Sequence, residues 1–153
     1  MFFGVQQIFQ NYAGELPDGQ VWDEEVRLGV LADQLGYDSI WPVEHHFRDY
    51  AACPDNLQYL SYMAANTERI GLATGAVILP WNDPLRVVEK LSMLDHLSGG
   101  RAFLGLGRGL ARCEYSGFDI DMASSRERFD EAAELILEAL DTGYFEGGGR
   151  YYP

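Results

Sequence analysis

The sequence predicts an α/β fold made of four successive strand–helix units. Apolar segments typical of buried strands alternate with segments whose apolar residues recur at helical spacing. The strands begin roughly 30–40 residues apart, which is the length of a βαβ unit. A doubly wound parallel sheet and part of a (β/α)8 barrel of the TIM-barrel type both fit this alternation. A complete barrel usually needs about 250 residues, so four units correspond to half of one.

The chain is expected to form a single domain over residues 1–153. It has 153 residues, of which 47% are hydrophobic, enough to bury one core. No internal repeat, low-complexity linker or shift in composition divides it. A half barrel would therefore be one incomplete domain.

The first unit joins a strand over residues 2–9 to a helix over residues 22–35. A loop over residues 11–20, which contains Gly and Pro, separates the two. Acidic residues near the helix start suit the helix dipole, and Gly36 is expected to end the helix. The residues expected to face the core share helical spacing: Val26, Val30, Leu31 and Leu35.

The second unit consists of a short apolar strand over residues 39–43 and a helix over residues 56–66. One helical face is apolar and is expected to pack inward. Its members are Leu57, Leu60, Met63 and Ala64.

The third unit begins with a strand over residues 70–79. This segment is apolar apart from Thr74 and its glycines, as expected for a parallel strand covered on both faces. Asp83 and Pro84 then supply a helix N-cap and a proline at the first helical position. The helix should end at Gly99–Gly100, with Val87, Leu91 and Leu94 facing inward.

The fourth unit places a strand at residues 102–106, followed by a loop over residues 108–123. Ser124 and Glu127 match the capping-box pattern and predict the start of the last helix. Gly143 should end it. The expected inward face is Phe129, Ala133, Ile136 and Leu140.

The charge balance excludes several classes of partner. The formal net charge is −13, and Lys90 is the one lysine among eleven basic residues. Without a basic stripe, neither nucleic acid nor an anionic membrane surface is an expected ligand. The start of the chain lacks a signal-peptide pattern, and no run approaches the roughly 18–20 apolar residues of a membrane span. A cytoplasmic location is expected.

No metal site is expected either. Cys53 and Cys113 form no CxxC pair, which argues against both a zinc site and a disulfide framework. His45 and His46 are adjacent, and His96 belongs to another element, so the three histidines do not form a ligand set.

Titratable side chains crowd at the end of the second strand. Glu44, His45 and His46 directly follow its apolar run. Reactive groups in α/β enzymes gather at the carboxyl ends of strands. A helix cap and a surface histidine would explain the same residues without any function, and the segment alone leaves both interpretations open.

Glycines mark the ends of the third and fourth strands. Gly75 and Ala76 interrupt the third strand, and Gly107 and Arg108 follow the fourth. Glycine there permits close approach of a ligand, and arginine can bind a phosphate with two hydrogen bonds. Packing of Gly75 beside a bulky neighbour, and pairing of Arg108 with a nearby carboxylate, remain the alternatives.

The carboxyl ends of parallel strands lie on one rim, so these groups are expected to share a pocket. An imidazole, a flat backbone surface and a phosphate-binding arginine together suit a planar, phosphorylated cofactor such as flavin mononucleotide (FMN).

Five motifs occur along nearly the whole chain: residues 44–47 (EHHF), 74–80 (TGAVILP), 83–86 (DPLR), 94–101 (LDHLSGGR) and 107–110 (GRGL). In these motifs and in their order, the chain resembles the bacterial-luciferase-like flavin-dependent monooxygenases. The resemblance implies a (β/α)8 barrel, of which this chain contains about the first four βα units. Matching family members are more than twice as long.

The resemblance also implies roles for single residues. His45 and Glu44 are the candidate catalytic residues: His45 matches an active-site histidine near the reactive edge of the flavin ring, and Glu44 precedes it in the same motif. Gly75–Ala76 matches a strand segment that lies against the ring and carries a non-proline cis peptide bond. Arg108 matches a residue that holds the flavin phosphate, next to Gly107. Light-emitting luciferases have cysteine at position 107, so bioluminescence is not expected.

The implied reaction is oxygenation of a small organic substrate by reduced FMN and O2, with a separate flavin reductase as partner. Two alternatives are an F420-dependent oxidoreductase of the same superfamily, which transfers hydride, and a non-catalytic flavin-binding fragment or subunit. A half barrel exposes open sheet edges, so a homodimer that rebuilds a pseudo-barrel is a further possibility.

Overall fold

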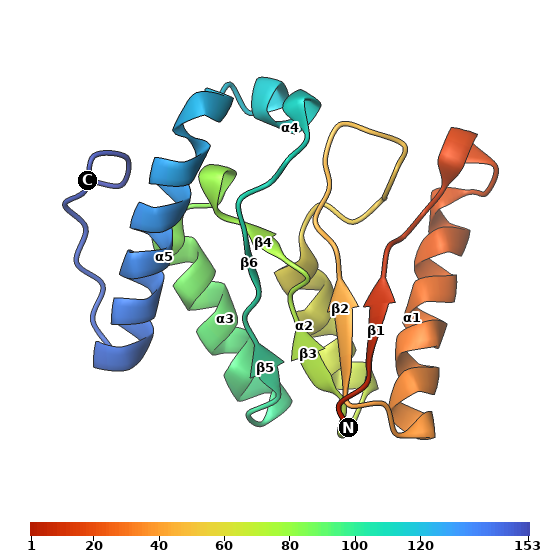
Figure 1. The fold of residues 1–153 in the computed structure, drawn as a ribbon. Coiled ribbons are helices and arrows are strands. Elements are labelled where there is room, and N and C mark those ends of the chain that lie inside the picture. Colours follow the sequence, from red (N-terminus) through yellow and green to blue (C-terminus); the bar gives the residue numbers. More distant parts are fainter.

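A computed structural model describes residues 1–153 and shows a parallel sheet whose strands follow the order of the sequence (Figure 1). The main sheet runs β1 (Gly4–Gln7), β2 (Ser39–Pro42), β3 (Gly71–Ala73) and β5 (Ala102–Phe103). Each neighbouring pair is parallel. A doubly wound sheet reverses its strand order at a switch point, and this sheet does not. The arrangement is therefore that of half a (β/α)8 barrel.

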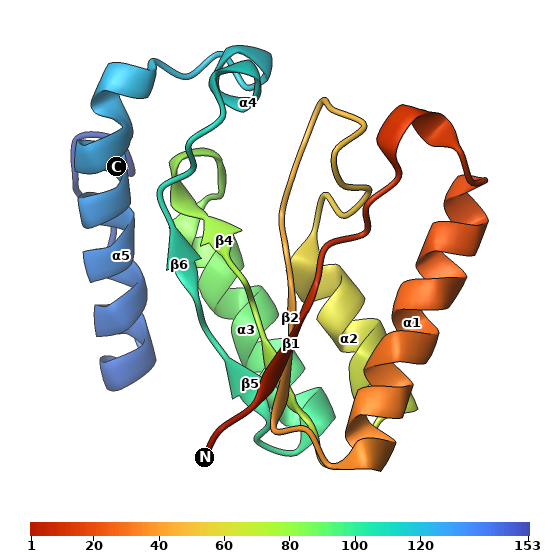
Figure 2. The same cartoon turned by 45° about the vertical axis from the view of Figure 1, so that its right-hand side comes forward.

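The four long helices lie on one face of the sheet, in the same order as the strands (Figure 2). Their bounds are α1 (Asp18–Leu35), α2 (Asn56–Asn66), α3 (Pro84–Ser98) and α5 (Ser125–Thr142). No helix combines the length and apolar character needed to cross a membrane.

The expected helix ends are largely confirmed. Asp83 caps α3 by accepting a hydrogen bond from the Arg86 N–H, with Pro84 at the first helical position. Gly36, Gly99 and Gly143 end their helices in the left-handed conformation. The first helix, however, starts at residue 18 rather than 22, inside the expected loop.

The third and fourth strands are both interrupted; the sequence predicted the interruption of the third strand at Gly75–Ala76 but not that of the fourth. The expected strand over 70–79 is divided into β3 and β4 (Val77–Ile78), followed by a 3-10 turn, η2 (Leu79–Trp81). The expected strand over 102–106 is divided into β5 and β6 (Leu106–Gly107), and β6 pairs with β4. Both interruptions occur where Thr74 and Gly105 meet.

The contact between Thr74 and Gly105 explains the paired interruption. The Thr74 hydroxyl donates to the Gly105 carbonyl at 2.9 Å, and the Gly105 N–H donates back to the hydroxyl at 2.8 Å. A Cβ at Gly105 would overlap the Thr74 carbonyl oxygen, so only glycine permits this approach. The Thr74 hydroxyl thus takes the place of backbone hydrogen bonds between the two strands, and both strands change direction at this point.

Helical faces are predicted correctly for the two central helices and only in part for the two outer ones. The expected core residues of α2 and α3 are buried. On α1, Leu31 and Leu35 are exposed instead, and on α5 Leu140 is exposed. The buried residues there are Val21, Gly29, Ala32 and Asp33 on α1 and Ser125, Ala132, Ile136 and Ala139 on α5. Each outer helix packs against a neighbour on one side only, so part of its apolar surface stays uncovered.

The capping box at the start of the last helix is not formed. The Ser124 hydroxyl donates to the Asp121 carbonyl at 2.7 Å and accepts from the Arg128 side chain. A 3-10 turn, η3 (Met122–Ser124), precedes α5, and the Asp121 carboxylate accepts from the Ala123 N–H. The expected loop over 108–123 also contains a short helix, α4 (Arg112–Gly117).

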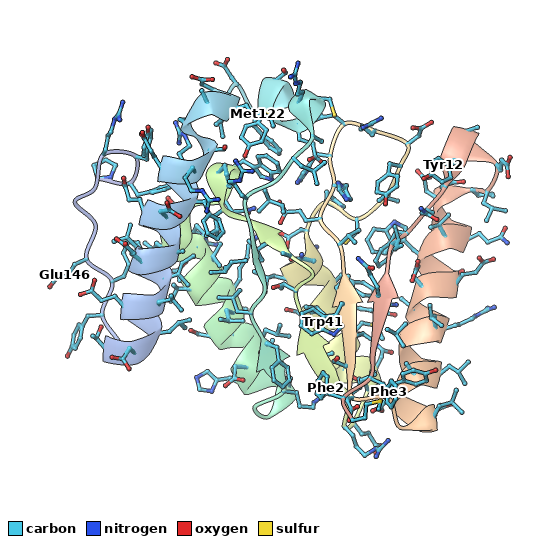
Figure 3. The ribbon with its side chains drawn as sticks, in the orientation of Figure 1. Phe2, Phe3, Tyr12, Trp41, Met122 and Glu146 are labelled. Atoms are coloured by element: carbon cyan, nitrogen blue, oxygen red, sulfur yellow. The ribbon has the colours of Figure 1, made fainter.

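The face of the sheet opposite the helices is open. Trp41 projects from β2 on this face, and Phe2 and Phe3 lie at its lower edge (Figure 3). Phe2, Phe3 and Phe103 are all exposed. This face would be the interior of a complete barrel.

Candidate functional site

The predicted site residues all line one cavity of about 450 Å³ at the carboxyl ends of the strands. The apolar part of its lining includes Val43, Ile78 and Leu110. The site residues in the lining are Glu44, His45, Gly75, Ala76, Gly107 and Arg108. The structure thus brings together groups from three different strands, as the strand-end argument expects.

Glu44 is a buried hydrogen-bond acceptor that connects the loop after β2 with β4 and with the turn that follows β4. Its Oε1 accepts from Trp81 Nε1 at 2.7 Å and from Asn82 Nδ2 at 2.9 Å. The same oxygen lies 3.2 Å from His46 Nε2, and Oε2 accepts from the Ile78 N–H at 3.1 Å. Four partners occupy the carboxylate, so these contacts favour a positioning role over direct proton transfer.

His45 is half-buried and pairs with a carboxylate from α4. Its Nδ1 lies 3.0 Å from Glu114 Oε1, which also accepts from the His46 N–H at 2.9 Å. The ring contacts Tyr50 edge-on, with centroids 4.9 Å apart. Its Nε2 has no hydrogen-bond partner in the chain.

His46 points into an aromatic cluster. Its ring lies edge-on to Phe118 at 4.8 Å, and Phe118 stacks on Trp81 at 5.2 Å with 17° between the planes. Together with its contact to Glu44, this packing gives His46 a structural position. The two adjacent histidines therefore differ in environment, which the sequence could not decide.

The glycine-rich wall of the cavity combines packing with exposed backbone. A Cβ on Gly75 would lie 3.1 Å from the Trp41 Cβ, so packing beside a bulky neighbour accounts for this glycine. A Cβ on Gly107 would lie 2.7 Å from the Ile78 Cδ1. The Gly75–Ala76 peptide bond is cis, as the family resemblance implies.

Arg108 has no carboxylate partner. Its guanidinium donates to the Ser125 hydroxyl at 3.2 Å, at the N-terminus of α5, and takes part in none of the ion pairs of the chain. The alternative in which Arg108 pairs with a neighbouring carboxylate is therefore wrong. An exposed cation beside a helix N-terminus suits an anionic ligand.

Tyr115 fixes the loop that carries Arg108. Its hydroxyl donates to the Arg108 carbonyl oxygen. Burial raises the pKa of Tyr115, although hydrogen bonding to Ser125 opposes the shift, so the phenol stays protonated as a donor.

A second cavity of about 430 Å³ adjoins the first at His45. Its lining is more polar and comes from the loops that follow the first two strands and from the first turns of α1. The polar residues in it include Asn11, Asp18, Arg48 and Asp49. His45 is the one residue that lines both cavities.

Sequence reasoning missed Glu114, Trp81 and Asn82. Glu114 lies within the expected loop over 108–123, several residues beyond the end of the fourth strand. Its one sequence signal is position, since the loop over 108–123 follows the arginine motif directly. Trp81 and Asn82 follow the third strand and could have been added by the strand-end rule.

Comparisons with known proteins bear on the family and the fold of the chain. The family model for luciferase-like monooxygenases matches residues 1–153. The 4-hydroxyprotoasukamycin monooxygenase of Streptomyces nodosus subsp. asukaensis is 35% identical over 127 residues, which cover 83% of this chain and 34% of that protein.

Solved structures share the fold. The monooxygenase RslO1 from Streptomyces bottropensis superimposes with a TM-score of 0.85 at 40% identity, covering 92% of this chain and 43% of that chain. The oxygenating constituent of 3,6-diketocamphane monooxygenase from Pseudomonas putida, in complex with FMN, gives 0.88 at 22% identity, over 99% and 43%. The chain thus spans well under half the length of these relatives and carries part of their barrel. It belongs to the luciferase-like monooxygenase family.

Proposed function

We propose that the chain forms the flavin-binding part of a monooxygenase that uses reduced FMN and O2 to oxygenate a small organic substrate. One observation carries the proposal: six residues from three strand ends line one cavity, whose arginine has no carboxylate partner. A cavity of about 450 Å³ is within the range of small-ligand sites. The FMN of the camphane monooxygenase belongs to a protein of the same fold.

The residues present fit FMN. Arg108 and the Ser125 hydroxyl at the start of α5 would hold its phosphate. The bare backbone of Gly75–Ala76 and Gly107 would lie against the flat ring, with Ile78 adding apolar contact. Glu44 would hold this wall in place through the Ile78 N–H.

Bound reduced FMN supplies the reaction with O2, and the chain supplies orientation, water exclusion and proton transfer. His45 is the group suited to hold or move a proton, because its Nε2 has no hydrogen-bond partner and the residue lines both cavities. Val43, Ile78 and Leu110 keep part of the cavity apolar. A separate flavin reductase would supply the reduced cofactor, as the family resemblance implies.

A deazaflavin, F420, is the second candidate cofactor. Arg108 favours any phosphorylated planar ligand and does not distinguish the two. A parallel titration with FMN and F420 would separate oxygen chemistry from hydride transfer.

The Arg108→Ala variant tests the cofactor assignment. We expect FMN, followed by its fluorescence, to bind the variant about 10- to 100-fold more weakly, because a charge-assisted hydrogen bond stabilises by about 1.5–3 kcal/mol. Riboflavin, which lacks the phosphate, should bind parent and variant alike. Arg27→Ala removes an exposed arginine on α1 and should change neither affinity.

Equal FMN affinity in parent and Arg108→Ala would contradict the phosphate assignment. Saturable binding of FMN without turnover of an aldehyde panel would indicate a flavin-binding component that lacks catalysis.

A further inference from the structure

The pairing of His45 with Glu114 has a chemical consequence for the imidazole. Glu114 is buried, and its side chain is 3% exposed. Its only ion-pair partner in the chain is His45, since no Arg or Lys lies within ion-pair distance. A buried carboxylate without a cation must be satisfied by donors, and His45 Nδ1–H and the His46 N–H fill this role.

We infer that Glu114 is a positioning residue that fixes the proton of neutral His45 on Nδ1 and leaves Nε2 free for proton transfer at the cavity. A carboxylate only accepts hydrogen bonds, so the nitrogen facing it carries the proton. The inference rests on the proposed function, in which His45 handles a proton.

The free nitrogen is placed where a reacting group can reach it. The His45 side chain is 29% exposed, and His45 lines both cavities. A ligand in either cavity can give a proton to Nε2, which binds it with its ring lone pair and forms an imidazolium. Glu114 stabilises that positive charge across 3.0 Å. The reverse step returns the proton and restores the neutral ring, so no oxidant or reductant is needed.

Helix α4 holds Glu114 rigidly enough for this role. Tyr115 donates to the Arg108 carbonyl, and Phe118 stacks on Trp81. The Phe47 ring fills the space beside Gly117, where any Cβ would collide with it. The same helix therefore connects the imidazole to the arginine loop.

The first test is nitrogen NMR of the 15N-labelled 153-residue chain, with the His45 ring assigned from a His45→Gln variant. At a pH where the His45 ring is neutral, the spectrum should show a protonated Nδ1 and an unprotonated Nε2. A protonated Nε2 in the parent would overturn the inference, and this result needs no Glu114 variant to fold.

The second test compares Glu114→Gln with Glu134→Gln, which removes one charge from the exposed face of α5. Glu114→Gln keeps the size but loses the acceptor-only carboxylate, so the Nε2-protonated form should appear. Oxygenation of an aldehyde panel with photoreduced FMN should fall roughly 10- to 100-fold in kcat, with FMN affinity changed less than twofold. Glu134→Gln should match the parent in all three measurements.

An unchanged ring spectrum and unchanged kcat in Glu114→Gln would also overturn the inference. The proposed function can fail separately: a parent chain that shows the Nδ1 proton but binds no FMN would contradict the flavin assignment, while the role of Glu114 in fixing the proton would stand.

Discussion

Replacing Glu44 with Gln should destabilise the fold strongly, because the buried carboxylate accepts hydrogen bonds that hold neighbouring segments together. Its side chain is 4% exposed and meets donors from His46, Ile78, Trp81 and Asn82. Glutamine has the same shape but only one acceptor oxygen. If that oxygen keeps the three donors at Oε1, the amide NH2 faces the Ile78 N–H, and two donors oppose each other.

The magnitude follows from the four contacts. Hydrogen bonds to a charged group stabilise by about 1.5–3 kcal/mol and neutral ones by about 0.5–1.5 kcal/mol, so three weakened bonds cost about 3 kcal/mol. The unsatisfied Ile78 N–H adds about 1–3 kcal/mol. The amide is easier to bury than a carboxylate, which offsets part of this and leaves a net loss of roughly 2–4 kcal/mol.

Thermal and urea unfolding followed by circular dichroism measure this loss. For a domain of this size, 1 kcal/mol shifts Tm by about 2–4 °C, so Glu44→Gln should melt roughly 5–15 °C below the parent. Glu134→Gln, on the exposed face of α5, should stay within about 0.5 kcal/mol of the parent.

A Glu44→Gln chain that melts within about 1 °C of the parent would refute the structural interpretation. If such a chain also bound FMN normally and lost oxygenation, Glu44 would be a catalytic group, as the EHHF motif first suggested. The measurement therefore distinguishes the two roles that the sequence left open.

Four further predictions concern other parts of the chain. His45→Ala should lower oxygenation while FMN still binds, and loss of binding alone would make His45 structural. Burial raises the pKa of Asp33, but donors from residues 68–70 outweigh it and hold that pKa below its usual value. Stability from Asp33 is thus present above about pH 4 and lost as pH falls through the folded-state pKa. Asp33→Asn should flatten this acid loss in urea titrations; an equally steep loss would contradict the assignment. Burial raises the pKa of Cys53 to about 12, so a thiol reagent at pH 8 should label exposed Cys113 and spare Cys53 until the chain unfolds. Light scattering should show concentration-dependent association, and a monodisperse, cooperatively melting monomer would count against exposed barrel edges.

The expectation of association has a specific structural basis. Leu28, Leu31 and Leu35 are exposed on α1, and Leu137 and Leu140 are exposed on α5. These two helices flank the half barrel, and β1, on the same side as α1, is an edge strand that pairs with β2 alone. Apolar surface at both flanks is a liability in a free chain.

The sequence by itself determined the four strand–helix units and the rim on which the site lies. Helix ends at Gly36, Gly99 and Gly143 are local decisions, because glycine adopts the left-handed conformation with little cost. The sequence also predicted the inward faces of α2 and α3. Both helices have a neighbouring helix on each side, so their apolar residues are buried on the face that helical periodicity indicates.

Tertiary structure decided the rest. The strand order excluded a doubly wound sheet, which the alternation of elements could not do. Local pattern predicted a capping box at Ser124, but Asp121 and Arg128 compete for its hydroxyl. Whether the leucines on α1 and α5 are exposed depends on which elements pack against these helices, and helical periodicity does not specify that.

The residues of the candidate site also fall into those that the sequence predicts and those that only the structure reveals. Glu44, His45, Gly75, Ala76, Gly107 and Arg108 were found from strand ends, because parallel strands bring their carboxyl ends to one rim. Glu114 lies on a short helix about seventy residues from His45 in sequence. Only the folded chain brings that carboxylate to Nδ1, and no periodicity or motif spacing specifies a contact between such distant residues.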